Sequence, residues 1–222
     1  MKDLEKDIQR ASTASEEELE SLVHHPSLRV IARLIYNKNL TEDLALILAG
    51  RKNISPDILE ALSINARWKN SYKIKLALCK NPKTPQRLSL ALIKSLKIFD
   101  LADMTKNKVI PINLRMRIEA DISERIPAIP LGIKIALAKR ASSSVLMKLV
   151  EEGLKEVVAA CLDSPYMTEG DIYKIISMKN ISPQVIRMIA AHARWSCRYM
   201  IRWALIRNTR APLARIVNFL KD

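Results

Sequence analysis

Residues Ile74–Leu92 read IKLALCKNPKTPQRLSLAL, and this stretch decides the fold class. An apolar run comes first, a polar break around Asn81 and Pro82 follows, and a second apolar run completes the pattern. Thr84 and Pro85 suit the N-cap and the first helical position of the second run, because a hydroxyl satisfies a free N–H group there and the missing proline N–H costs nothing. The stretch predicts two short helices joined by a tight turn, without strand alternation.

Related helix–break–helix units occur in both halves of the chain. Their bounds are Val30–Leu48, Ile133–Leu149, Val157–Ile176 and Ile201–Leu220. Ser55-Pro56 and Ser182-Pro183 repeat the predicted helix start, and Ser15–Glu18 predicts a capping box before a further helix. Helices of about 8 to 12 residues are marginal alone in water. They must therefore bury one face against their neighbours, as stacked repeats do.

A longer repeat relates residues 41–85 to residues 168–212, at a shift of 127. Along these segments 16 of 45 positions are identical without a gap, where chance gives about three. The shared motifs are KNISP, at Lys52–Pro56 and Lys179–Pro183, and Ala-Arg-Trp, at Ala66–Trp68 and Ala193–Trp195. The chain is therefore predicted to be an internal duplication.

The stretch Leu76–Leu92 resembles the leucine-rich repeat variant, a bacterial HEAT-like helical repeat with the core A-x-N-P-x-T-P-x-x-L-L. The other copies are degenerate, because Asn81-Pro82 is replaced by Asn37-Lys38, Asn208-Thr209 or Arg140-Ala141. The resemblance covers about two thirds of the chain, at the level of fold. It implies an all-α protein, a right-handed α-solenoid of short HEAT-like helical repeats.

The same family has been associated with an iron–sulfur cluster held by a compact group of cysteines. Cys79, Cys161 and Cys197 lie far apart in the sequence. No cluster is carried over from the resemblance, and we expect no cofactor.

One continuous α-solenoid domain is predicted over residues 1–222. Residues 1–25 have a net charge of −4 and predict an acidic cap, which repeat arrays need at their ends. Residues 26–97 and 131–222 are the predicted first and second repeat halves. Residues 98–130, punctuated by Pro111, Pro127 and Pro130, supply connecting helices.

The charge balance of the chain is strongly basic, with 37 Lys and Arg against 23 Asp and Glu and a formal net charge of +14. Hydrophobic residues make up 49% of the sequence, which excludes a disordered tail protein. Residues 64–98 and 179–221, which overlap matching parts of the two halves, each hold nine basic residues and no acidic one. They predict two regions of positive potential. A solvated basic face without a partner remains the alternative.

The candidate residues for binding an anionic partner come from these two segments. They are Arg67, Lys73, Lys75, Arg194, Arg198, Arg202 and Arg207, and Lys221 belongs to the same basic run. Trp68, Trp195 and Trp203 lie among them as core or stacking aromatics. The recurrence of Trp68 as Trp195 favours a packing role, whereas an exposed tryptophan beside an arginine could stack on a base.

Signatures of catalysis and metal binding are scarce. The chain has four glycines and contains no G-x-S-x-G motif, no Walker loop and no H-E-x-x-H motif. His24, His25 and His192 lack further ligands at metal-site spacing. Asp100 and Asp103 could pair for acid–base work, although such pairs more often lie on a solvated helix surface. We therefore predict no catalytic residue, no metal and no small-molecule substrate.

The chain is also similar in size, charge and helical class to alkylpurine DNA glycosylases built from HEAT-like repeats. Those enzymes hold a damaged base between tryptophans beside an aspartate. Here no acidic residue follows Trp68 before Asp100, and none follows Trp195 before Asp222. The catalytic part of that resemblance therefore fails.

We expect a non-enzymatic binding or scaffold protein with a basic surface for an acidic protein partner. The alternative is a nucleic-acid-binding protein without sequence specificity. Residues 1–10 show no apolar stretch behind a basic start, and no apolar run reaches the ~18 residues of a membrane span. Three scattered cysteines suit reduced thiols. A cytoplasmic protein of a bacterial type, without a membrane partner, is therefore predicted.

Overall fold

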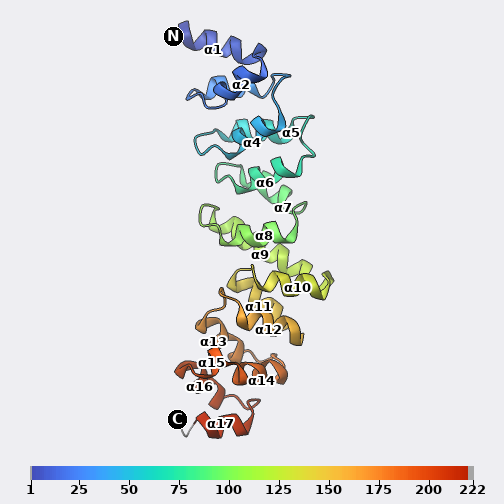
Figure 1. Cartoon of the computed structure of the whole chain (residues 1–222), viewed down its shortest axis with the longest axis vertical. Helices are drawn as coiled ribbons and strands as arrows, with labels where there is room; N and C mark the ends of the chain where they lie inside the picture. The colour runs from blue at the N-terminus through green and yellow to red at the C-terminus, as the bar shows by residue number, and fades with distance from the viewer. Residues whose placement is uncertain (1, 220–222) are drawn as a thin grey trace. The chain divides into compact units, whose positions relative to one another are not determined.

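The computed structural model describes residues 2–219, and this part of the chain contains 17 α-helices, one short 3₁₀ helix and no strand (Figure 1). The predicted all-α class is confirmed for these residues. Lys221 and the end of the predicted unit Ile201–Leu220 lie outside them.

The described residues form two compact units, and α8 (Ile98–Lys106) and α9 (Ile112–Arg125) contribute to both. The first unit comprises the residues up to Asp100 together with Asn107–Arg117. In this unit α1 packs on α3, and α4 packs on α6. Its other helices are α1 (Lys2–Thr13), α2 (Glu16–Leu22), α3 (Leu28–Leu34), α4 (Glu42–Gly50), α5 (Pro56–Ile64), α6 (Tyr72–Lys80) and α7 (Gln86–Ile93).

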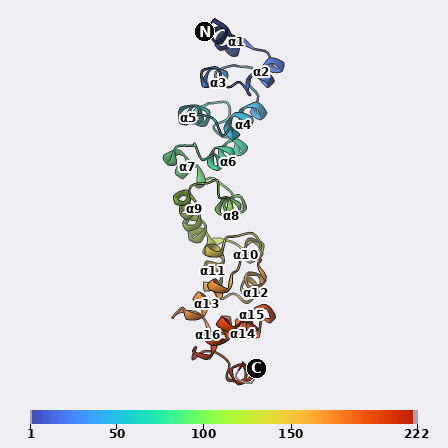
Figure 2. The same cartoon turned by 90° about the vertical axis from the view of Figure 1, so that its left-hand side faces the viewer.

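The second unit comprises Leu101–Lys106 and the residues from Ile118 onward. In this unit α10 packs on α12, and α13 packs on α16; Figure 2 gives a second view of these helices. The elements are η1 (Ile126–Ala128), α10 (Leu131–Ala138), α11 (Ser143–Glu151), α12 (Lys155–Asp163), α13 (Glu169–Ser177), α14 (Pro183–Ala191), α15 (Ala193–Ser196), α16 (Tyr199–Ile206) and α17 (Leu213–Phe219).

The boundary between the units lies inside residues 98–130, the segment predicted to connect the two repeat halves. That the chain forms one continuous domain with a cap at residues 1–25 stays a prediction.

Four helices of the first unit have counterparts in the second at a shift of 127 residues. The pairs are α4 with α13, α5 with α14, α6 with α16 and α7 with α17. Each pair begins at matched positions, and α4 and α5 also end at positions matched to the ends of α13 and α14. The contact of α4 with α6 likewise has its counterpart in the contact of α13 with α16.

Side-chain caps fix the start of several helices. Ser15 accepts a hydrogen bond from the Glu18 N–H, and the Glu18 carboxylate accepts one from the Ser15 N–H, so the predicted capping box is confirmed. Ser182 caps α14 by accepting from the Val185 N–H at 3.4 Å. Ser55 occupies the N-cap position of α5, but its side chain makes no capping hydrogen bond.

The prediction that Thr84 caps α7 is wrong. This helix begins at Gln86, and Pro85 occupies its N-cap position. Thr84 is buried, and its hydroxyl donates to the Leu78 carbonyl oxygen at 2.6 Å. Since α6 ends at Lys80, the hydroxyl gives a second donor to a carbonyl at the end of α6, which also accepts from the Asn81 N–H, and does not cap an N–H at the start of α7.

Each unit has its own apolar core. In the first unit Leu34, Leu48, Leu59 and Ile74 are buried in one cluster drawn from α3, α4, α5 and α6. In the second unit aliphatic side chains of α11, α13, α14 and α16 are fully buried, including Leu205. These short helices are therefore stabilised by packing on neighbouring helices, as the sequence predicts.

Candidate binding surface

Arg67 belongs to the loop between α5 and α6 and contacts the loop between α3 and α4. Its guanidinium donates to the carbonyl oxygens of Asn37, at 2.8 Å, and of Leu40. It also lies over the Trp68 ring, with Cζ 4.6 Å from the ring centroid. Because two N–H groups already bind carbonyls, Arg67 holds two loops together and offers fewer donors to a phosphate.

Arg194 makes the same contacts in the second unit. Its guanidinium donates to the carbonyl oxygens of Ser164 at 3.0 Å and Met167 at 3.2 Å. Its Cζ lies 4.2 Å from the centroid of the Trp195 ring. Both acceptors lie 127 residues after those of Arg67. The arginine therefore makes equivalent backbone contacts in the two units.

Trp68 and Trp195 are buried, with 4% and 1% of their surface exposed. The Trp195 indole N–H donates to the Leu162 carbonyl oxygen at 2.9 Å. In the first unit the corresponding carbonyl oxygen is that of Ile35, and it accepts a hydrogen bond from the Asn65 amide at 3.2 Å. The Trp68 indole N–H has no partner among the described residues. Both tryptophans pack in the core, and neither ring is available to stack on a base.

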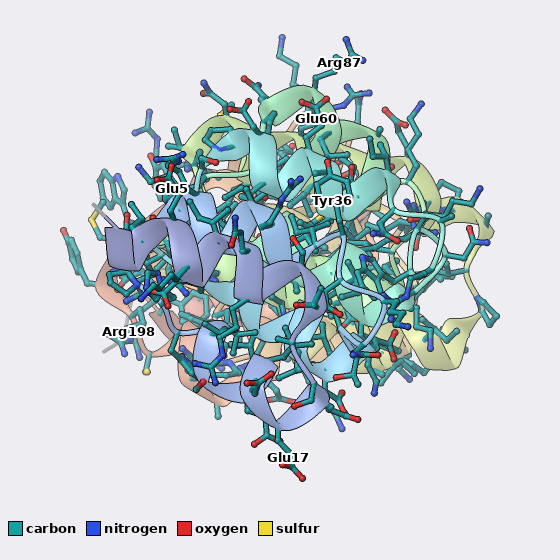
Figure 3. All side chains as sticks on the ribbon, turned by 90° about the horizontal axis from the view of Figure 1, so that it is seen from above. Glu5, Glu17, Tyr36, Glu60, Arg87 and Arg198 are labelled. Atoms are coloured by element: carbon teal, nitrogen blue, oxygen red, sulfur yellow. The ribbon has the colours of Figure 1, made fainter. Side chains whose placement is uncertain are left out.

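Arg198 and Arg202 also have partners inside the second unit. The Arg198 side chain, labelled in Figure 3, pairs with Glu169 at 3.7 Å. The Arg202 Nε–H donates to the Ser196 carbonyl oxygen at 2.8 Å, and its guanidinium lies 5.5 Å from the Phe219 ring centroid. Arg198 is more than half exposed, so its charge still faces solvent, whereas Arg202 is only partly exposed.

Lys73, Lys75 and Arg207 have no ion pair or side-chain hydrogen bond among the described residues. Lys73 is exposed on α6, and Lys75 is half-buried on the same helix. Arg207 is exposed directly after the last residue of α16, where a cation is favoured by the helix dipole.

A hollow of about 430 Å³ lies beside Arg207 between the C-terminal ends of α13 and α16. Trp203 and Tyr173 line it and are 48% and 40% exposed. No acidic side chain lines the hollow. Its lining residues are Tyr173, Ile176, Ser177, Met178, Lys179, Trp203, Ala204, Arg207, Asn208, Thr209 and Arg210.

Hydrogen bonds fix the loop that forms one wall of this hollow. The Asn208 amide donates to the Ile176 carbonyl oxygen at 2.8 Å, and its Oδ1 accepts from the Arg210 N–H at 2.9 Å. The Arg210 guanidinium donates to the carbonyl oxygens of Ile181 and Lys179, both at 2.6 Å. Arg210 therefore contributes charge to a rigid wall, while the Arg207 and Lys179 side chains remain available to a ligand.

The exposed side of α16 continues this surface toward the start of the helix. Tyr199 is 75% exposed, Met200 is 49% exposed, and Trp203 lies one helical turn beyond Tyr199. We call Tyr199, Met200, Trp203 and Arg207 the α16 face. An aromatic and apolar strip ending in a cation can bind a partner that has both apolar and anionic groups.

The aspartates considered for acid–base chemistry contact other side chains, and two of the three cysteines are buried. Asp100 accepts a hydrogen bond from the Tyr72 hydroxyl, and Asp103 pairs with Arg140 and with Lys106. Burial raises the pKa of the Cys79 and Cys161 thiols to about 12. Cys197 differs from the other two cysteines because it is exposed.

Two further observations concern metals and membranes. No group of three or more His, Cys, Asp and Glu side chains among the described residues is arranged to hold a metal ion. No helix of residues 2–219 combines the length and the apolar character that a membrane span requires.

Of the predicted binding residues, Trp203 and Arg207 lie together on the α16 face. Arg67 and Arg194 instead donate hydrogen bonds to backbone carbonyls of the chain itself. Sequence reasoning missed Tyr173, because it lies about 30 residues before Trp203 on a different helix. It also missed that Arg67 and Arg194 bind backbone carbonyls. Their recurrence at matched positions was the signal that could have indicated this structural role.

Comparison of the chain with protein-family models, with curated proteins and with solved structures found no match.

Proposed function

We propose that each unit is a short right-handed α-solenoid of HEAT-like repeats similar to the leucine-rich repeat variant, and that the two units arose by internal duplication. The matched starts of four helix pairs support this proposal. So do the hydrogen bonds of Arg67 and Arg194, because donor and both acceptors shift together by 127 residues. Independent sequences would have no reason to keep both ends of these contacts in register.

The protein is, in this proposal, a non-enzymatic cytoplasmic binding protein that takes an acidic protein partner on the α16 face. One observation supports it above all others. Exposed Trp203 and Tyr173 share a hollow with Arg207 and Lys179, and no carboxylate lies among the lining residues. Tryptophan, tyrosine and arginine are the side chains that most often dominate protein interfaces.

The engagement of several arginines by groups of the chain itself favours a protein partner over nucleic acid. A nucleic-acid groove needs many cations free to reach successive phosphates. Arg67, Arg194 and Arg210 each use guanidinium N–H groups on backbone carbonyls, and Arg198 has a carboxylate nearby. Beside the hollow the cations Arg207 and Lys179, unpaired among the described residues, lie close together, which suits a compact acidic patch or helix.

A direct binding assay on the full chain tests this function. The probe is an N-acetylated synthetic peptide of about 16 residues with aspartate in its first turn, leucines at i, i+3, i+4 and i+7, and a net negative charge. We call it the acidic helix. A single-stranded and a duplex oligonucleotide serve as competing ligands, and all affinities are measured across a salt series.

Arg207→Gln should weaken binding of the acidic helix about tenfold. Lys80→Gln is the matched control, because Lys80 is exposed at the position of α6 that corresponds to Arg207. It removes the same charge and should leave the affinity unchanged. Tighter binding of an oligonucleotide than of the acidic helix at every salt concentration would instead favour the nucleic-acid function, and an absence of binding to the acidic helix would contradict the proposal.

A further inference from the structure

Tyr72 and Tyr199 occupy matched positions, each as the first residue of its helix, α6 or α16. In the first unit a segment of the chain itself lies over Tyr72. The Tyr72 hydroxyl donates a hydrogen bond to the Asp100 carboxylate and accepts one from the Lys97 N–H at 3.1 Å. Asp100 lies in the first turn of α8, so the segment over Tyr72 is the N-terminal turn of a helix that carries a carboxylate in that turn.

The same segment also places a cation over the Tyr72 ring. The Lys97 ammonium lies 5.1 Å from the Tyr72 ring centroid, and the ring is only partly exposed. Burial of the hydroxyl and then its hydrogen bond to Asp100 raise the pKa of Tyr72. The hydroxyl is therefore held as a proton donor to a carboxylate.

In the second unit the corresponding tyrosine is open to solvent. Tyr199 is 75% exposed, and its hydroxyl has no hydrogen bond among the described residues. The neighbouring helix α17 packs on α16, as α7 packs on α6, so this neighbour is in place in both units. The two units differ in what covers the tyrosine. Lys97 and Asp100 lie over Tyr72, whereas no segment within residues 2–219 lies over Tyr199 in this way.

The residues around Tyr199 are also more apolar than those around Tyr72. Met200 and Trp203 stand at the positions of Lys73 and Leu76, and both are about half exposed. Arg207 ends the strip, and no acidic residue occurs between residues 179 and 221. The Glu169 carboxylate pairs with Arg198. A segment that covers this face must therefore supply apolar side chains and carboxylates of its own for Tyr199 and Arg207.

We propose that the α16 face binds the N-terminal turn of an acidic amphipathic helix from a partner protein, with the Tyr199 hydroxyl donating to a carboxylate in that turn. This inference rests on the proposed function and specifies the chemistry of the partner. The apolar side of the partner helix packs on Met200 and Trp203. A second carboxylate, farther along the partner helix, lies near Arg207.

A double-mutant cycle tests the Tyr199 contact. Four affinities are measured: the wild-type chain and Tyr199→Phe, each with the acidic helix and with the same peptide carrying asparagine for aspartate in its first turn. Tyr199→Phe should weaken binding of the acidic helix about tenfold, the lower range for a hydrogen bond to a charged group. It should change the affinity for the asparagine peptide by less than about twofold, because the charged acceptor is gone.

Tyr36→Phe is the matched control, since Tyr36 is 73% exposed in the first unit and outside the α16 face. It should leave both affinities unchanged. Tyr199 is a surface residue, so Tyr199→Phe is not expected to lower the melting temperature, and a melting curve of each variant verifies this.

The outcomes separate the inference from the proposed function. If the acidic helix binds and depends on Arg207, but the two changes act additively in the cycle, the Tyr199–carboxylate contact is overturned while the proposed function stands. If the acidic helix does not bind at all, both fail. A second copy of the chain could offer the acidic first turn of α2. Sedimentation tests this alternative. Self-association that Tyr199→Phe abolishes would show that the α16 face binds a second copy, and it would overturn the proposed partner.

Discussion

Helices α6 and α16 start at matched positions and differ mainly on the side that faces away from the core. Their inward residues are alike, since Ile74 and Leu78 are buried as Ile201 and Leu205 are. Their outward tyrosines differ, because Tyr72 lies under the start of α8 and Tyr199 is open.

This difference separates packing from binding. Inward positions in repeats must fill the same space in each copy, so substitutions there destabilise the fold. Outward positions are constrained only where another segment covers them. The α16 face is therefore the part of the matched pair where a change can serve recognition rather than folding.

The largest effects are expected at the two buried tryptophans, Trp68 in the loop between α5 and α6 and Trp195 in α15. Trp195→Ala and Trp68→Ala should each lower the free energy of unfolding by about 3–5 kcal/mol, because a large buried side chain is lost. The conservative changes separate the two sites. Trp195→Phe leaves the Leu162 carbonyl without its donor, whereas Trp68→Phe removes an N–H that has no partner.

Trp195→Phe should therefore cost about 1–2 kcal/mol more than Trp68→Phe. Urea denaturation of the four variants measures these free energies. Equal costs for the two phenylalanine variants would show that the indole hydrogen bond does not distinguish the loops.

A smaller difference is expected at Asn81 and Asn208, which also match at a shift of 127. The buried Asn81 amide donates to the carbonyl oxygens of Ala49 at 2.7 Å and Arg51 at 2.9 Å. The Asn208 amide donates to the Ile176 carbonyl oxygen alone. Asn81→Ala should lower the free energy of unfolding by about 2 kcal/mol and Asn208→Ala by about 1 kcal/mol. The first change leaves two carbonyl oxygens without this donor and the second leaves one. Thermal melts that reverse this order would contradict the account of these loops.

The smallest of the stability effects is expected at the helix caps. Ser182 accepts the Val185 N–H, whereas Ser55, at the matched position, makes no side-chain capping bond. Ser182→Ala should cost about 1 kcal/mol, and Ser55→Ala should leave the melting temperature almost unchanged. A loss of the same size in both variants would mean that the two helix starts are equivalent after all.

The sequence predicted the helical class and the starts of several helices because local chemistry sets them. Ser15 with Glu18, and Ser182 before Pro183, are short-range patterns that leave few alternatives. Thr84 before Pro85 has the same pattern, yet its hydroxyl bonds backward to Leu78. A hydroxyl both donates and accepts, so sequence alone cannot say which end of a turn it satisfies.

The candidate surface was predictable only in part. Trp203 and Arg207 stand out because an aromatic residue and a cation lie four apart on one helix. Tyr173 joins them through the packing of α13 on α16, which local spacing cannot reveal. Charge counts likewise give no sign that the Arg67 and Arg194 guanidinium groups are occupied by backbone carbonyls.

The most direct test of the central claim, that the α16 face is a binding surface and its counterpart on α6 is not, uses the pair Trp203 and Leu76. The affinity of the full chain for the acidic helix is measured for Trp203→Ala and for Leu76→Ala, below the melting temperature of each. Trp203→Ala should weaken binding at least about tenfold, as loss of an interface tryptophan does, and Leu76→Ala should change it by less than about twofold. Unchanged affinity in Trp203→Ala, or an equal loss in both variants, would contradict the account.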